Sequence, residues 1–198
     1  MNVLIGDAVS LVRSYYKDES VINGYTSDRL YPAERIVFET YLSPGSSVLN
    51  LGCGTGRTSL ELAKRGFKVI GIDFAPKMIA TAKKQAEILN IDVEFNTADA
   101  TKLDYKPATF DNIIFSDNGI EKVPGKKNRE KILQNVFKVL KPGGYFIFTT
   151  RSGLALFSKR LFRWAKISID FLLKRCIGGN DKWEFGDYTS GKQYVHYT

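Results

Sequence analysis

The sequence contains little cysteine, almost no histidine and no long apolar run. Its two cysteines, Cys53 and Cys176, lie far apart and form neither a metal-ligand spacing nor a disulfide framework, so we expect no metal site and a reducing compartment. No run approaches the roughly 18 apolar residues that a membrane span needs. The N-terminus carries Asp7 and no basic start, unlike a signal peptide. These absences predict a cytoplasmic protein.

The composition is that of an ordinary globular domain. The chain has 198 residues, of which 43% are hydrophobic and 25% charged, which excludes a disordered tail, a collagen-like rod and a disulfide-rich miniprotein. The formal charge of +8 is uneven, since residues 1–100 hold 11 basic and 12 acidic side chains and residues 101–198 hold 18 and 9. The positive charge therefore belongs to the C-terminal half.

Short apolar runs alternate with amphipathic segments in the middle of the chain. The expected strands are residues 47–51, 68–72, 92–96, 110–115 and 145–150. The expected helices are residues 32–42, 57–65, 76–89 and 128–140, the last ended by the Lys-Pro-Gly-Gly of 141–144. This alternation predicts an α/β fold, a Rossmann-like, doubly wound, mostly parallel sheet with flanking helices. We expect three parts: a helical cap at 1–46, an α/β core at 47–150 and a basic amphipathic segment at 151–198.

A glycine loop connects the first strand to the first core helix. Gly52, Gly54 and Gly56 remove side chains that would keep a ligand from the backbone amides and the helix N-terminus. A dinucleotide-binding loop would place its third glycine at position 57, where Arg57 stands, so the spacing is GxGxG. Asp73 ends the second strand, where a carboxylate can accept hydrogen bonds from a ribose diol. The alternative for Asp73 is a solvated turn acid or a helix cap.

Asp99 follows the third strand and is the next acid along the same expected sheet edge. A carboxylate there can accept a hydrogen bond from an exocyclic amine such as that of adenine, and the alternative is an ordinary loop acid. Because the carboxyl ends of parallel strands meet at one edge of a sheet, we expect the glycine loop, Asp73 and Asp99 to share one crevice.

Several motifs occur together in a familiar order. They are VLNLGCGTGR at 48–57, VIGIDFAPKMI at 69–79, NTADA at 96–100, FDNIIFS at 110–116 and VLKPGGYFIFTT at 139–150. In order and spacing this set resembles the motifs of class I S-adenosylmethionine-dependent methyltransferases. The resemblance covers about residues 30–150 and implies that the core binds S-adenosylmethionine.

The resemblance also implies roles for individual residues. The glycine loop would pack against the methionine part of the cofactor, Asp73 would hold the ribose hydroxyls, and Asp99 would take the adenine amino group. The family often has an acid where this chain has Asn50, whose oxygen can still accept a hydrogen bond. The cofactor-binding residues implied are Asn50, Gly52, Cys53, Gly54, Gly56, Asp73, Phe74, Met78, Asp99, Ala100 and Ser116.

Methyl transfer from a sulfonium needs little from the protein beyond positioning, because the donor is already activated. Asp117 and Asn118 follow the fourth strand and would position the reacting groups, with an ordinary turn as the alternative. His196, the only histidine, is expected in a strand or a frayed tail rather than in catalysis. The remaining candidates are three tyrosines that either line a cap over the cofactor or simply pack an N-terminal helix: Tyr15, Tyr16 and Tyr25.

Basic residues dominate two segments of the C-terminal half. Residues 154–176 have a helical apolar period, and we weigh three interpretations: a lid over the acceptor, a membrane-surface helix and an RNA-facing helix. The second group is expected to be the solvated start of a helix: Lys122, Lys126, Lys127, Arg129 and Lys131.

The last strand of the core is expected to lie near a sheet edge. Family members usually continue with a helix and two antiparallel strands that cover this edge, and we expect those strands to be absent or incomplete here. A truncated chain, or a second subunit in a homodimer, would account for the uncovered edge.

The leading hypothesis is a methyltransferase that uses S-adenosylmethionine to methylate a small molecule by in-line displacement. The alternatives are an RNA (tRNA) methyltransferase and a non-catalytic S-adenosylmethionine-binding module. The chain lacks the (Asn/Asp)-Pro-Pro-(Tyr/Phe) motif that, in the family, marks many enzymes methylating exocyclic amines of nucleobases, which disfavours that chemistry.

Overall fold

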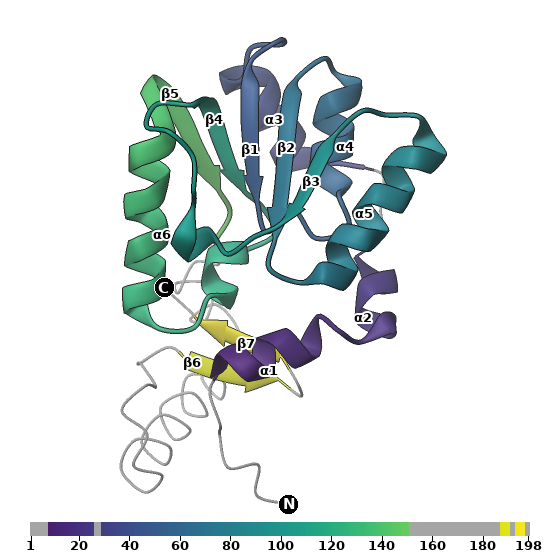
Figure 1. Ribbon diagram of the computed structural model, residues 1–198, viewed down its shortest axis with the longest axis vertical. Helices are drawn as coiled ribbons and strands as arrows, with labels where there is room; N and C mark the ends of the chain where they lie inside the picture. The colour runs from purple at the N-terminus through teal and green to yellow at the C-terminus, as the bar shows by residue number, and fades with distance from the viewer. Residues whose placement is uncertain (1–7, 26–28, 151–186, 191–192, 197–198) are drawn as a thin grey trace, which may run out of the picture.

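The computed structural model describes residues 8–25, 29–150, 187–190 and 193–196. A five-stranded sheet in the order β3-β2-β1-β4-β5 forms its centre, with all neighbouring strands parallel (Figure 1). The strands are β1 (Ser47–Leu51), β2 (Lys68–Asp73), β3 (Glu94–Thr97), β4 (Phe110–Phe115) and β5 (Leu140–Phe148). The chain winds from β1 outward to β3 and then returns to the other side of β1. This doubly wound order confirms the predicted Rossmann-like fold.

Helices cover both faces of the sheet (Figure 1). Those against the sheet are α3 (Pro32–Tyr41), α4 (Arg57–Lys64), α5 (Pro76–Leu89) and α6 (Lys126–Val139). Two further helices, α1 (Ala8–Tyr15) and α2 (Glu19–Gly24), lie beyond the carboxyl ends of the strands (Figure 1), and the 3-10 turns are η1 (Ala100–Lys102) and η2 (Gly119–Lys122). Ile132 of α6 packs in one core cluster with Leu49. Phe38 of α3 and Leu62 of α4 pack with Val48 in another. Because successive residues of β1 point to opposite faces, both faces of this strand are buried, which explains why the adjacent Val48 and Leu49 are both apolar.

Two strands begin at different residues from those expected. β3 spans Glu94–Thr97 rather than 92–96, and β5 begins at Leu140 rather than at 145. Leu140 pairs with Phe110, but the next aligned pair is Tyr145 with Asn112, so residues 141–144 form a bulge within the ladder. The Lys-Pro-Gly-Gly segment therefore does end the helix, but it lies inside the strand.

The N-terminal and C-terminal segments meet at the carboxyl ends of the strands. β6 (Asp187–Ser190) and β7 (Gln193–His196) form a separate antiparallel pair, and β7 lies beside α1 and η2 (Figure 1). Within the described residues β5 is an edge strand of the five-stranded sheet. The predicted helix at 154–176 lies outside the described residues. None of the described helices is long and apolar enough to cross a membrane.

Asp111 ties the first residues of β1 and β4 together. Its Oδ2 accepts hydrogen bonds from the amide (2.8 Å) and hydroxyl (2.6 Å) of Ser47, and its Oδ1 accepts one from Lys141 Nζ (2.8 Å). The Lys141 ammonium and then the Ser47 donors hold the pKa of this carboxyl well below its usual value.

We therefore expect Asp111→Asn to lower the free energy of unfolding by about 1 kcal/mol at pH 7, since solvent screens this partly exposed ion pair. A carboxyl with a lowered native pKa stabilises above its unfolded pKa, so the gap to the wild type should close as the pH falls below about 4. Urea denaturation at neutral and acidic pH measures the gap, with the exposed Asp104→Asn as control. An equal gap at every pH would contradict the assignment.

Candidate functional site

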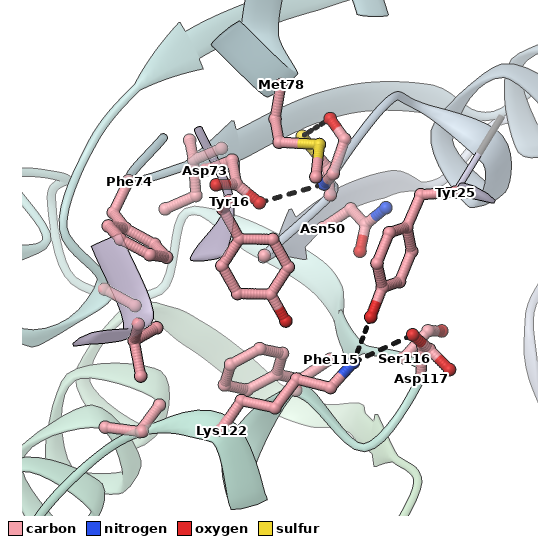
Figure 2. A pocket seen from close by; sticks show the side chains of 18 of the residues that line it. Tyr16, Tyr25, Asn50, Asp73, Phe74, Met78, Phe115, Ser116, Asp117 and Lys122 are labelled. Carbon is pink, nitrogen blue, oxygen red and sulfur yellow. Dashed lines mark hydrogen bonds and ion pairs between the residues drawn. The ribbon is translucent and has the colours of Figure 1, made fainter. Parts of the chain in front are cut away.

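A cavity of about 490 Å³ opens at the carboxyl ends of the central strands. The turns after β1, β2, β3 and β4 line it, and α1 and α2 contribute residues from the N-terminal segment (Figures 1 and 2). Most of the residues expected to bind the cofactor line this cavity: Asn50, Gly52, Cys53, Gly54, Asp73, Phe74, Met78, Asp99, Ala100 and Ser116. The structure thus gathers residues from four strand ends into one site, as the parallel topology predicts.

The glycine loop depends on the conformations of its first and last glycines. Gly52 has φ 58°, and a Cβ there would lie 2.7 Å from the Phe115 ring. Gly56 has φ 92° at the start of α4, and a Cβ there would be within 3.3 Å of three core side chains. Gly56 does not line the cavity, so it serves the turn and the helix packing, while Gly52 and Gly54 line the cavity and a Cβ at Gly54 would meet only open space.

Asp73 is fixed by the loop beside it. Its Oδ2 accepts a hydrogen bond from Gly54 N (3.0 Å; Figure 2), and its Oδ1 accepts one from Ala75 N (2.9 Å). The residue is 8% exposed, so it is not a solvated turn acid. Burial raises the pKa of this carboxyl, and the two backbone donors oppose the rise. Asp73 therefore presents an oriented carboxylate, a strong hydrogen-bond acceptor, to the cavity.

Asn50 has one satisfied and one unsatisfied polar atom. Its Nδ2 donates to Ser59 Oγ (2.8 Å), whereas its buried Oδ1 accepts no hydrogen bond from any described residue. The residue is 1% exposed and lines the cavity. A buried acceptor without a donor is costly, so Asn50 Oδ1 is suited to receive an N–H from a ligand.

Asp99 lies in the turn after β3, the edge strand on the β2 side of the sheet. Its Oδ1 accepts hydrogen bonds from the amide and hydroxyl of Thr101, both 2.8 Å long, and this caps η1. Asp99 also lines the cavity, with its Oδ2 outside these bonds. It is therefore both a loop cap and a cavity residue, so the two interpretations of the sequence are compatible.

Asp117 and Asn118 lie in a strained turn after β4. Both adopt left-handed conformations, with φ 52° and 54°. The Asn118 amide donates to Thr149 Oγ1 (2.7 Å), and Asn118 does not line the cavity. Asp117 does line it, so only the first of the two predicted positioning residues lies at the cavity.

The expectation that Lys122 and Arg129 lie on a solvated helix start is wrong. The Lys122 side chain is 12% exposed, and its Nζ contacts Asp117 Oδ2 (2.9 Å) and Tyr25 Oη (3.2 Å) inside the cavity (Figure 2). Arg129 is buried and donates to the carbonyl of Val123 (3.0 Å). Lys122 contacts Tyr25, which is 97 positions away in the chain, and a local count of charges cannot show such a contact. Sequence reasoning thus missed Lys122 as a site residue.

Two of the three N-terminal tyrosines line the cavity, and the third packs against one of them. Tyr16 and Tyr25 line it, with ring centroids 5.9 Å apart, and Tyr15 packs edge-on against Tyr16. Thr55 Oγ1 of the glycine loop donates to the Tyr25 carbonyl (2.8 Å), which fixes the end of α2 over the loop.

A buried ion pair at the cavity rim was also missed. Arg57 donates from Nη1 and Nη2 to the two carboxylate oxygens of Glu34, at 2.6 and 2.8 Å. The Arg57 guanidinium stacks 4.3 Å from the centroid of the Tyr31 ring, and Glu34 also accepts from the Tyr31 amide (2.9 Å). These contacts connect the first turn of α3 to that of α4.

A family model described as "Methyltransferase domain" matches residues 48–144 of this chain. The chain belongs to the class I S-adenosylmethionine-dependent methyltransferases. S-adenosylmethionine is accordingly its cofactor. The residues fit this ligand. The glycine loop leaves space for the ligand to approach the backbone, and the unpaired Asn50 Oδ1 can accept a hydrogen bond from it.

Two solved structures resemble the chain. A SAM-dependent methyltransferase from Methanosarcina mazei superposes with a TM-score of 0.69 at 26% identity, covering 85% of this chain and 78% of that one. The PH0226 protein from Pyrococcus horikoshii gives 0.59 at 31% identity, covering 74% and 69%.

Two curated relatives match over the core. Phosphoethanolamine N-methyltransferase 3 of Arabidopsis thaliana is 37% identical over 109 residues, 54% of this chain and 21% of its own length. Demethylmenaquinone methyltransferase of Thermus thermophilus is 36% identical over 105 residues, 50% and 44% of the two chains. The chain therefore spans 21% of the length of the first relative and 44% of the length of the second.

Proposed function

We propose that this chain transfers the methyl group of S-adenosylmethionine to a small-molecule acceptor. The observation that carries the proposal is the single cavity in which the glycine loop, the oriented Asp73 carboxylate and the unpaired Asn50 oxygen meet. These groups match an extended ligand that has a ribose diol and an ammonium group.

The cavity residues divide among the parts of the cofactor. Asp73 would accept hydrogen bonds from the two ribose hydroxyls, and Asn50 Oδ1 would accept one from the amino group. Asp99 Oδ2 would accept from the adenine amine. Phe74 and Met78 would flank the adenine ring, since both line the cavity between the Asp73 and Asp99 turns. Ser116 would lie beside the methionine part.

The chain's contribution to the reaction is positioning and exclusion of water. When bound, S-adenosylmethionine supplies a methyl group that its sulfonium already activates for displacement. The N-terminal tyrosines restrict access to the cavity, and the Lys122 ion pair holds Asp117 in place. Asp117 would receive the acceptor's proton where the acceptor is a hydroxyl or a protonated amine, because a carboxylate beside the reacting atom can act as a general base.

Similarity to curated relatives supports a small acceptor. The names of two matched relatives, phosphoethanolamine N-methyltransferase and ubiquinone biosynthesis O-methyltransferase, denote small-molecule chemistry. The RNA and membrane interpretations depended on residues 154–176, which the structure does not describe, so no described observation favours them.

Calorimetric titration with S-adenosylmethionine and with NAD tests the first step. We expect saturable binding of S-adenosylmethionine and none of NAD, because Arg57 occupies the place of the third glycine of a dinucleotide loop. A screen of small acceptors with methyl-labelled cofactor then tests transfer. Preference for NAD would exclude the proposal. If the chain binds the cofactor and methylates RNA but no small molecule, the acceptor is RNA and the proposed acceptor class is wrong.

A further inference from the structure

The side of the cavity nearest η2 carries a cluster of hydrogen-bond donors that cofactor binding leaves unexplained. Lys122 Nζ donates to Tyr25 Oη (3.2 Å) and Asp117 Oδ2 (2.9 Å), and lies 5.2 Å from the Tyr25 ring centroid. Tyr16 stands next to Tyr25, and its hydroxyl points toward the same space (Figure 2). All four residues line the cavity.

The Lys122 side chain is a cation at neutral pH. Burial alone would lower its pKa, but Asp117 and the Tyr25 hydroxyl outweigh this, and the net shift is upward. A buried ammonium is stable only when its N–H groups find acceptors. Lysine has three N–H groups, and the two contacts above use two of them. The third is available to a group in the cavity.

The two tyrosines add further donor capacity. Tyr25 Oη accepts a hydrogen bond from Lys122, so its own O–H is free to donate. If one of the two tyrosine hydroxyls donates to the other, the second O–H group is still available to donate to a ligand. Burial raises the pKa of Tyr16, with a further contribution from Tyr25, so this hydroxyl stays protonated and is a donor. A ligand here must therefore supply acceptor oxygens.

We propose that Lys122, Tyr25 and Tyr16 form a subsite for an anionic oxygen group, a carboxylate or a phosphate, carried by the methyl acceptor. This inference rests on the proposed function and narrows its substrate class. Asp117 acts as the competing anion, because it pairs with Lys122 when no acceptor is bound. Nearby Val12, Phe115 and Val123 would contact the apolar part of the acceptor.

Asp117 and a ligand anion compete for Lys122. Substitutions of Lys122 and of Asp117 should therefore change the affinity for the anion in opposite directions. The full chain, saturated with S-adenosylhomocysteine, is titrated with inorganic phosphate and separately with acetate at constant ionic strength, and amide chemical shifts report the dissociation constants. Lys122→Met should weaken anion binding at least tenfold. Tyr25→Phe should weaken it severalfold, and Asp117→Asn should strengthen it severalfold. The exposed Lys127→Met is the matched control and should leave it unchanged.

A purely structural role for the cluster predicts a different pattern. Lys122→Met and Asp117→Asn would then weaken binding together, or neither would change it, and either result overturns the subsite. The cofactor's own carboxylate is the rival anion. If Lys122→Met weakens S-adenosylhomocysteine binding as much as it weakens phosphate binding, the cluster serves the cofactor and the proposal is overturned. Phosphate titration of the chain without cofactor separates this test from the proposed function, since cofactor binding can fail while the anion still binds.

Discussion

Replacing Asp73 with alanine is expected to weaken S-adenosylmethionine binding by about 100-fold or more. Each charge-assisted hydrogen bond to a ribose hydroxyl is worth about 1.5–3 kcal/mol, and losing two corresponds to at least this factor. The carboxylate also holds Gly54 N and Ala75 N, so its loss frees the loop that shapes the site. Calorimetry measures the dissociation constants, and circular dichroism checks the fold.

Two further variants make the Asp73 result specific. Asp73→Asn keeps the shape and removes the charge, so we expect an intermediate loss. Asp92→Ala removes an exposed acid and should leave cofactor affinity unchanged. Unchanged affinity in Asp73→Ala would refute the ribose assignment, and an equal loss in Asp92→Ala would attribute the effect to net charge.

The same carboxyl gives cofactor binding a defined pH dependence. Burial raises the pKa of Asp73, so its protonation begins at a higher pH than for an ordinary aspartate. The protonated form cannot accept two strong hydrogen bonds, so affinity should fall as the pH decreases toward this raised pKa. The affinity of Asp73→Asn should lack this fall, because an amide does not titrate in that range.

The cofactor side of the cavity could be predicted because its residues follow the ends of strands. Gly52 and Asp73 come at the ends of largely apolar strands and Asp99 lies two residues after the third strand, and a parallel sheet brings such ends together. Sequence spacing therefore carried three-dimensional information for these residues. The apolar runs also predicted that the strands exist. The start of β5 could not be predicted, because the local Pro-Gly-Gly pattern is typical of a turn and does not indicate a bulge within a strand.

The acceptor side could not be predicted because its contacts join distant segments. Lys122 meets Tyr25 across 97 positions, and no local pattern relates them. Lys122 stands beside a run of basic residues that is typical of a solvated helix start, yet the turn after β4 directs it into the cavity. Its burial depends on the position of α2, which Thr55 fixes through the Tyr25 carbonyl. Tertiary packing thus overrode the local charge pattern.

The Arg57–Glu34 pair is expected to carry the largest single contribution of any ion pair among the described residues. Both side chains are nearly buried, 11% and 3% exposed, and the pairing uses both carboxylate oxygens. Burial would lower the Arg57 pKa, but the Glu34 hydrogen bonds and charge raise it overall, so the Arg57 guanidinium remains charged. Removing one partner leaves a buried charge uncompensated, which costs about 3–5 kcal/mol.

Arg57→Met should therefore lower the free energy of unfolding by about 3–5 kcal/mol in urea denaturation. The double variant Arg57→Met/Glu34→Gln should recover part of this loss, because it removes the second charge as well, so the two single effects should not add. Arg35→Met breaks an exposed pair with Glu39 and should cost no more than about 1 kcal/mol. If Arg57→Met costs no more than Arg35→Met, the pair does not secure α3 to α4.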